Sequence, residues 1–185
     1  MRTQTLKVAL ASVIALGLLS GCGTKAEDVN SDGPETVALA IPTNCESTQV
    51  LAALEKIVPN SKYIPTSWQP AAGTELADVL NNGGLACSYG LQSAEIGTTV
   101  KWVSDSSGLF EKRVSGWLSE GYTKVDIAEL PTSEAYFLLK KQSATQEFHV
   151  WNLNVKYRGA WIQVSCTAFA QDLEAGIPLL KAAVA

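Results

Sequence analysis

The chain has 185 residues, 46% of them hydrophobic, and a formal net charge of −4 at neutral pH. This length and hydrophobic fraction are enough to bury the core of one globular domain. The acidic balance, with no basic stripe, argues against nucleic acid as a partner and gives no electrostatic attraction to an anionic membrane.

The N-terminal segment has the layout of a secretory signal. A basic start, with Arg2 and Lys7, precedes an uncharged apolar run at residues 8–19. A membrane-spanning helix needs roughly 20 apolar residues, so this shorter run favours a cleaved leader over a spanning anchor. The sequence Leu-Ser-Gly-Cys at residues 19–22 closes the run.

This Leu-Ser-Gly-Cys sequence resembles the lipobox of bacterial lipoproteins. In that family the leader is cut before the cysteine, whose sulfur carries a diacylglycerol. The resemblance implies that residues 1–21 are a signal peptide, that Cys22 is lipidated, and that the mature chain is anchored at the extracytoplasmic face of the bacterial cell membrane. Residues 22–42 are then the lipidated cysteine and a flexible tether of polar composition. Residues 43–185 are predicted to form a single domain.

Two helices separated by a proline-rich crossing are predicted at the start of this domain. Apolar residues recur at helical intervals over residues 50–58, and the helix begins at either Thr43 or Ser47. Residues 59–73 contain three prolines and are predicted to be extended without a regular element. Thr74 then caps a second, short helix.

Two antiparallel strands and a third helix follow. Residues 85–89 and 98–104 alternate apolar and polar side chains, as half-buried strands do. The helix begins at a cap at residue 105 or 106, buries one apolar face and ends at Gly121. A short strand is expected at residues 122–127.

The strongest β signal lies in residues 134–141, 147–157 and 160–169. If Arg158 and Gly159 form a two-residue hairpin loop, the register of the last two segments follows by counting from that loop. One face then pairs Val155 with Ile162, Leu153 with Val164 and Trp151 with Cys166. The opposite face pairs Asn154 with Gln163, Asn152 with Ser165 and Val150 with Thr167. This register separates apolar from polar side chains almost completely.

The chain ends in a helix from about residue 171, so strands and helices do not alternate regularly as they would in a parallel sheet. The sequence therefore predicts an α+β fold, a single antiparallel sheet with helices packed on one face. The other face of the sheet is expected to be open to solvent.

Three cysteines remain once Cys22 is lipidated, namely Cys45, Cys87 and Cys166. In an oxidising compartment, one disulfide and one buried thiol are the simplest allocation of this odd number. Cys166 falls on the apolar face of the hairpin, where a thiol packs as a small hydrophobe. We therefore predict a Cys45–Cys87 disulfide that joins the first helix to the first strand, with a Cys87–Cys166 bridge as the alternative.

A second resemblance concerns the surroundings of these cysteines. Cys45 at the first helix, followed by Gly-Gly-Leu-Ala-Cys-Ser-Tyr at residues 83–89, is similar to small, uncharacterised cell-envelope lipoproteins of actinobacteria. The similarity covers the first half of the domain. It implies a disulfide and an envelope location, and it brings no catalytic residue with it.

The sequence contains no recognisable motif for catalysis, a cofactor or a metal. His149 is the only histidine, and the hairpin register places it on the core face. The cysteines are too widely spaced for a local zinc motif, and no glycine-rich phosphate loop follows a strand. We therefore expect a protein that is not an enzyme and has no cofactor, with an envelope hydrolase as the least favoured function.

The polar face of the last hairpin is the candidate binding face. It gathers amides, hydroxyls and one indole, from Asn152, Asn154, Trp161, Gln163, Ser165 and Thr167. Asparagine is normally depleted in strands, and this set suits a neutral polar ligand such as an envelope glycan, a peptide or a protein partner. An ordinary solvated sheet face is the competing interpretation. The alternative function, carriage of a lipid or other apolar ligand, would use the space between sheet and helices near Trp102, Trp117 and Trp151.

Overall fold

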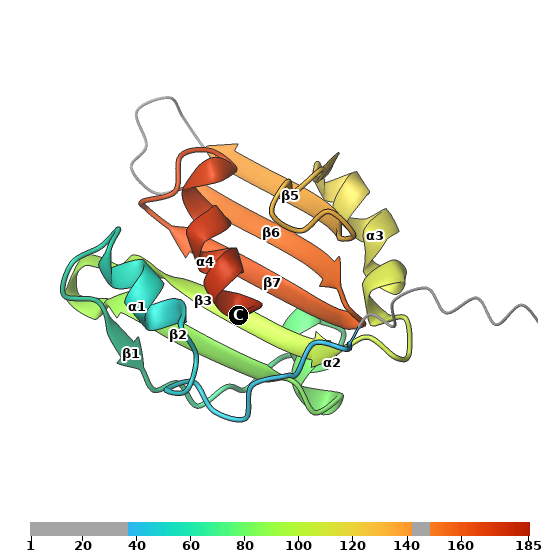
Figure 1. Cartoon of the computed structure of the whole chain (residues 1–185), viewed down its shortest axis with the longest axis horizontal. Helices are drawn as coiled ribbons and strands as arrows, with labels where there is room; N and C mark the ends of the chain where they lie inside the picture. The colour runs from blue at the N-terminus through green and yellow to red at the C-terminus, as the bar shows by residue number, and fades with distance from the viewer. Residues whose placement is uncertain (1–36, 142–148) are drawn as a thin grey trace, which may run out of the picture. The chain divides into compact units, whose positions relative to one another are not determined.

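The computed structural model describes residues 37–141 and 149–185, which form one antiparallel sheet and four helices (Figure 1). The strand order is β1-β2-β3-β7-β6-β5-β4, with β1 Lys62–Ile64, β2 Leu85–Leu91, β3 Ile96–Ser104, β4 Thr123–Val125, β5 Glu134–Lys141, β6 His149–Tyr157 and β7 Ala160–Thr167. The helices are α1 Val50–Glu55, α2 Glu75–Asn81, α3 Leu109–Glu120 and α4 Ile177–Ala183, with 3₁₀ turns η1 Gln92–Ala94 and η2 Glu174–Gly176. The predicted leader, Cys22 and most of the predicted tether lie outside the described residues. No helix in the described part is long and apolar enough to cross a membrane.

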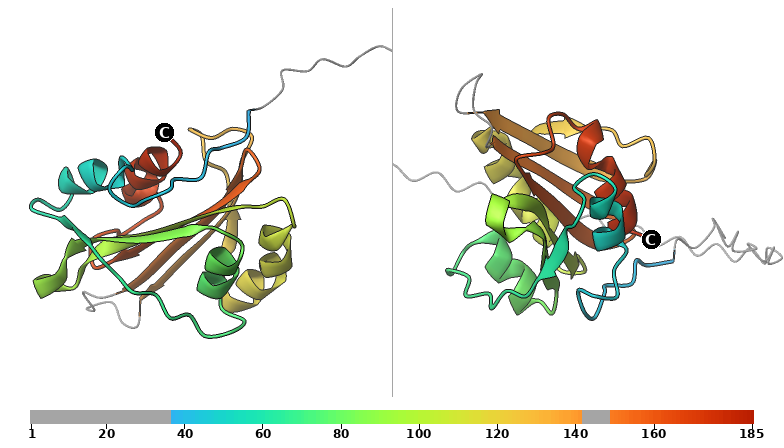
Figure 2. Two further views of the ribbon diagram at one scale, coloured as in Figure 1. Left: turned by 90° about the horizontal axis from the view of Figure 1, so that it is seen from below. Right: turned by 90° about the vertical axis from the view of Figure 1, so that its left-hand side faces the viewer.

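The predicted α+β fold with a single antiparallel sheet is confirmed. Two meanders, β1-β2-β3 and β7-β6-β5-β4, meet where β3 pairs with β7. Helices lie on both sides of this sheet (Figure 2): α1 and α4 cover what we call the first face, and α2 and α3 cover one end of the second face. Helices were expected on one face only. Helices α1 and α4 lie on one face, whereas α2 and α3 pack against the opposite face.

The first face carries the larger hydrophobic core. Alternation along the central strands places Val100, Trp102, Trp151, Leu153, Ile162 and Val164 on this face, each with 0% of its surface exposed. Two of these indoles are fixed by hydrogen bonds to backbone, since Trp102 Nε1 donates to Ala183 O at 2.8 Å and Trp151 Nε1 donates to Asp172 O at 2.6 Å. Gly176 lies so close to the Trp151 ring that a Cβ atom would have no room. The first face is therefore densely filled.

The second face carries a smaller aromatic core under α2 and α3, and this core explains why the helices are there. Phe110 and Trp117 of α3 pack edge-on against Trp161 of β7, with ring centroids 6.5 and 5.5 Å away. Val103 and Tyr136 extend the cluster on the neighbouring strands β3 and β5. Leaving such large side chains in water would cost several kcal/mol, so an amphipathic helix pair that covers them is stabilising.

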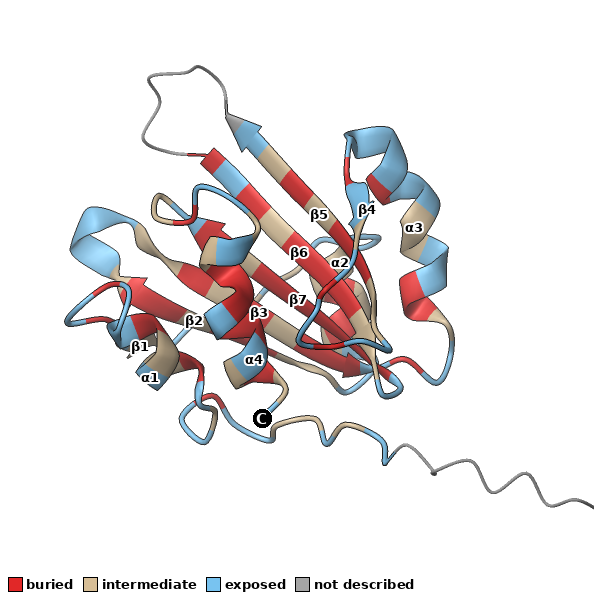
Figure 3. Cartoon of the chain, turned by 45° about the horizontal axis from the view of Figure 1, so that its top comes forward, coloured by how far each residue is buried: buried red, intermediate tan, exposed pale blue. Residues whose placement is uncertain are grey.

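The predicted register of the last hairpin is confirmed at every pair, from Tyr157 opposite Ala160 to Val150 opposite Thr167. Its loop residues Arg158 and Gly159 both have positive φ, +46° and +74°, as a two-residue type I′ turn requires. The buried residues gather along the central strands β3, β7 and β6 (Figure 3).

Several local predictions are wrong. The third helix follows an N-cap at Gly108 and not at residue 105 or 106, and the last helix begins at Ile177 and not near residue 171. The proline-rich crossing does contain a regular element, because Lys62–Ile64 pairs with β2 as a short edge strand. Prolines on either side of it are tolerated, since an edge strand needs its backbone donors on one side only. The first helix begins at Val50 after an N-cap at Gln49, later than either predicted cap. The residues before it form a turn in which the Asn44 side chain accepts the amide hydrogen of Ser47 at 2.8 Å.

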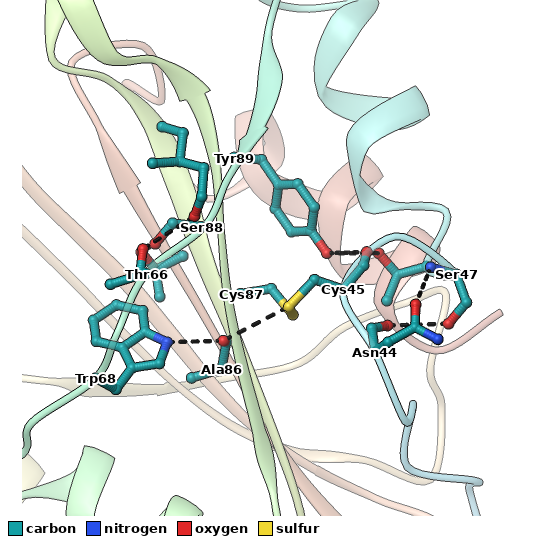
Figure 4. Close-up of a disulfide and its surroundings, with 12 residues drawn as sticks. Asn44, Cys45, Ser47, Thr66, Trp68, Ala86, Cys87, Ser88 and Tyr89 are labelled. Atoms are coloured by element: carbon teal, nitrogen blue, oxygen red, sulfur yellow. Dashed lines mark hydrogen bonds between the residues drawn. A yellow bond between two sulfur atoms is a disulfide. The ribbon is translucent and has the colours of Figure 1, made fainter.

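The predicted Cys45–Cys87 disulfide is confirmed, and Cys166 is a buried free thiol. The bridge joins the segment before α1 to β2, with Cα atoms 5.5 Å apart. Figure 4 shows how the Cys45 end is held: the Tyr89 hydroxyl donates to the Cys45 carbonyl at 2.7 Å and lies 2.8 Å from the Thr48 hydroxyl. The alternative bridge to Cys166 is not formed.

The Cys166 thiol makes the folded protein sensitive to alkaline pH. Burial raises the pKa of this thiol from its ordinary 9.0 to about 12, and a hydrogen bond with Thr98 opposes the rise. Below pH 9 the thiol is protonated in both the folded and the unfolded chain, so its contribution to stability is complete. As the pH rises toward 12, the unfolded chain ionises first and this stability is lost.

We therefore predict a loss of about 3 kcal/mol from Cys166 between pH 7 and pH 11. Urea unfolding of the wild type and of Cys166→Ala at both pH values measures it. The variant lacks this group, so its free energy of unfolding should fall by about 3 kcal/mol less than that of the wild type. Other alkaline titrations, such as that of Tyr122, affect both proteins alike. Equal losses in the two proteins would contradict the prediction.

Candidate functional site

The second face has an open half beside α2 and α3, and a row of uncharged polar side chains crosses it. Ser88, Thr99, Ser165 and Asn152 come from the adjacent strands β2, β3, β7 and β6, and each is the register neighbour of the next. We call these four residues the polar row. All four are half-buried, and the hydroxyls of Ser88 and Thr99 lie 3.1 Å apart. No described helix covers them, since α2 and α3 occupy the other end of this face (Figure 2).

The polar row leads into an open pocket between the sheet and the two helices. The pocket has a volume of about 390 Å³ and is lined by Gly73, Thr74, Glu75, Arg113, Gly116, Trp117, Glu120, Tyr122 and Asn152. Asn152 belongs to both the row and the pocket. Helix α2 presents its first turn to the pocket because Thr74 caps it, accepting the amide hydrogen of Ala77 at 3.2 Å. We call this cavity the amide pocket.

A buried hydrogen-bond network forms the wall behind the amide pocket. The Glu75 carboxylate accepts from Trp117 Nε1 and, at 2.6 Å, from Gln163 Nε2. Gln163 in turn accepts from Lys101 Nζ through its side-chain oxygen. Glu75 therefore joins α2, α3 and the sheet through one side chain.

Asn154 lies at the centre of this network and is fully buried. Its side-chain oxygen accepts from Trp161 Nε1 and from Gln163 Nε2, each at 2.9 Å. Its Nδ2 has no hydrogen-bond partner of ordinary geometry among the described residues. The Asn154 side chain also interacts with Tyr122, where it opposes the rise in the pKa of that hydroxyl.

Burial, and to a smaller extent the charge of Glu75, shifts the pKa of two groups around the pocket. Burial raises the pKa of Tyr122 to about 12, the nearby negative charge of Glu75 adds to the rise, and a side-chain hydrogen bond with Asn152 opposes it. Burial lowers the pKa of Lys101, and Glu75 partly offsets that shift. The Arg113 guanidinium is paired with Asp78 at 2.6 Å, so the one arginine of the pocket lining is already engaged. The pocket is thus polar: Glu120 is exposed, whereas Glu75 and Arg113 are engaged by other side chains.

The six residues of the predicted binding face separate into two groups. Asn152 and Ser165 are half-buried and Thr167 is exposed, all on the open half of the second face. Trp161, Asn154 and Gln163 are at most 2% exposed beneath α2 and α3. The hairpin register places all six on one face, as predicted, but the expectation that this face is open to solvent fails for the second group because helices cover it. Those three residues support the pocket wall and have almost no surface for contact with a ligand.

Sequence reasoning missed the remaining members of the site. Ser88 and Thr99 are the polar partners in the alternation of β2 and β3, so the same periodicity could have placed them beside Ser165 once the strand order was known. Glu75 and Tyr122 reach the site from segments far away in the chain, and no local pattern indicates them.

The structure places the residues considered for other functions as follows. His149 is buried, and its Nε2 is hydrogen-bonded to the Ala170 carbonyl. In the described ranges, no group of three or more His, Cys, Asp or Glu side chains could hold a metal ion. Trp102 and Trp151 lie in the core of the first face whereas Trp117 lies in that of the second, so no one space between sheet and helices adjoins all three. This arrangement counts against carriage of a lipid or other apolar ligand in one space near those indoles.

No protein-family model matches the chain, and no curated protein matches it either.

Proposed function

We propose that the protein is a lipid-anchored lipoprotein of the bacterial cell envelope that acts as a non-catalytic binding module. Its ligand site is the polar row together with the amide pocket. The observation that carries this proposal is the continuity of the two features through Asn152, which lies in the row and lines the pocket. A pocket with a few convergent polar groups beside an uncovered surface is the usual setting for ligand binding.

The disulfide and the leader together support the proposed location. A buried Cys45–Cys87 bridge indicates an oxidising compartment outside the cytoplasm, because disulfides rarely persist in the reducing cytosol. The lipobox at residues 19–22 then supports attachment through Cys22. A single acyl chain gives weak membrane binding, whereas the two acyl chains of a diacylglyceryl group give a stable attachment.

The anchor is tested by the substitution Cys22→Ala. We expect the variant either to stay unprocessed at its full length or to leave the membrane fraction, because neither cleavage at this lipobox nor lipidation can proceed without the cysteine. Fractionation and immunoblotting of cells that express the wild type, Cys22→Ala and the control Cys166→Ala measure this outcome. A Cys22→Ala protein that remains in the membrane at its mature size would contradict the lipid anchor.

The binding role is tested by co-sedimentation of the detergent-solubilised full chain with isolated bacterial cell walls. We expect the wild type to sediment with the walls and the double variant Asn152→Ala, Ser165→Ala to do so several-fold less. Gln49→Ala is the matched control, since Gln49 is an exposed amide at the N-terminus of α1 on the first face. Thermal unfolding of each protein verifies that the substitutions leave the fold intact. Equal sedimentation of the double variant and the wild type would show that the row is an ordinary solvated surface and not a binding site.

A further inference from the structure

The geometry points to a neutral glycan strand as the ligand of the polar row, an inference that rests on the proposed binding function. The row is linear, because its four residues are register neighbours on four consecutive strands of the sheet. Adjacent strands are about 4.8 Å apart, so the row offers one hydrogen-bonding side chain every 4.8 Å over about 14 Å. A ligand that uses the whole row must be elongated and must carry hydrogen-bonding groups along its length.

The chemistry of the row matches sugar hydroxyls. Serine and threonine hydroxyls and the asparagine amide each both donate and accept hydrogen bonds, as sugar hydroxyls do. None of Ser88, Thr99, Ser165 and Asn152 carries a charge, so the row itself favours a neutral ligand.

Aromatic side chains stand at both ends of the row. Figure 4 shows Trp68 and Thr66 on the same side of β2 as Ser88, opposite the disulfide. The Trp68 indole is half-buried, and its orientation is fixed because Nε1 donates to the Ala86 carbonyl at 2.9 Å. At the other end, Trp117 and Tyr122 line the amide pocket beside Asn152 but are at most 5% exposed. The partly exposed indole of Trp68 therefore offers the apolar contact that the carbon-bound face of a sugar ring requires.

Charge complementarity disfavours the other polymers. Glu75 and Glu120 line the pocket, the Arg113 charge is paired with Asp78, and the charge of Lys101 lies near that of Glu75, so an anionic polymer would meet carboxylates beside cations that are already compensated. An extended peptide usually adds to a sheet edge and places side chains in apolar pockets. The row crosses the middle of a sheet face and consists of four polar side chains, which favours the glycan.

The test uses the full lipidated chain in detergent and one preparation of isolated cell walls under three conditions. In the first the walls are untreated, in the second they are digested with protease to remove protein, and in the third they are mixed with an excess of soluble neutral oligosaccharides released from the same walls. We expect sedimentation of the wild type to survive protease and to fall at least tenfold with the competing oligosaccharides. The double variant Asn152→Ala, Ser165→Ala should bind untreated walls about tenfold more weakly than the wild type, as the loss of two hydrogen bonds of ordinary strength implies. Chitin, a neutral polysaccharide, is the defined probe and should bind with the same dependence on the two residues.

The possible outcomes distinguish a wrong assignment of the ligand from a wrong assignment of the binding role. Sedimentation that depends on Asn152 and Ser165 but is abolished by protease overturns the glycan and assigns a protein partner, while the binding role stands. Row-dependent sedimentation that is unchanged by the competing oligosaccharides also overturns the glycan. An absence of row-dependent sedimentation with untreated walls overturns the binding role and the glycan with it.

Discussion

Replacing Cys45 and Cys87 together by alanine should lower the free energy of unfolding by about 4 kcal/mol. The bridge closes a loop between residues 42 positions apart, and its loss returns the entropy of that loop to the unfolded chain. A domain of this size is stable by roughly 5 to 15 kcal/mol, so the loss is a large share of the total. Urea unfolding of the oxidised wild type and the double variant measures it.

The control for this experiment is Cys166→Ala, which removes a buried cysteine that makes no bridge. At pH 7 it should cost only about 1 kcal/mol, because little volume is lost. Hydrogen exchange localises the effect of the double variant. We expect α1 to lose most protection, although the Tyr89 and Thr48 hydrogen bonds still hold the segment around residue 45. A double variant that loses less than about 1 kcal/mol would contradict the stabilising role of the bridge.

Replacing Glu75 by alanine should lower the free energy of unfolding by about 3 kcal/mol. The Glu75 carboxylate accepts from the buried donors of Trp117 and Gln163, and its charge lies near the half-buried Lys101. Removal leaves two donors unpaired and a lysine without its compensating charge, which is more costly than losing the hydrogen bonds alone. Urea unfolding at pH 7 measures the change.

Glu120→Ala is the matched control, because Glu120 lines the same pocket but is exposed. It should change the free energy of unfolding by no more than about 0.5 kcal/mol. A fluorescence spectrum that reports the environment of the tryptophans should shift in Glu75→Ala and stay unchanged in Glu120→Ala. A cost for Glu75→Ala as small as that for Glu120→Ala would show that the network does not hold α2 and α3 on the sheet.

The sequence predicted the register of the last hairpin because one local feature determines it. Arg158 and Gly159 both adopt positive φ, and a two-residue loop of that type leaves only one way to pair the strands. The period of two then assigns every side chain of β6 and β7 to a face. The disulfide pairing followed from this register, because it placed Cys166 in the core of the first face and left Cys45 for Cys87.

The covering of the second face could not be predicted in the same way. Periodicity shows that α2 and α3 each have an apolar side to bury, but it does not show against which face of the sheet that side packs. Trp161 was therefore assigned to an open face, whereas α3 covers it with Phe110 and Trp117. The contact that fixes this arrangement joins Glu75 to Gln163 across 88 positions, and no local pattern records a contact at that separation.

The candidate site depends on the same long-range information. Asn152 and Ser165 were predicted to share a face because they belong to one hairpin. Extending them to a row with Thr99 and Ser88 requires the pairing of β3 with β7, which brings together strands on opposite sides of α3 in the chain. The pocket at the end of the row requires the placement of both helices as well.

The mass of the mature protein, purified from bacterial membranes without reductant and then cut into peptides, is the most direct test of an exported, lipid-anchored lipoprotein. We predict a chain that begins at Cys22 and carries a diacylglyceryl group on that cysteine. The non-reduced digest should contain one pair of linked peptides, joining Cys45 to Cys87, and an unlinked peptide with Cys166 as a free thiol. A chain that begins at Met1, or one that carries an unmodified Cys22, would contradict the lipid anchor and the location built on it.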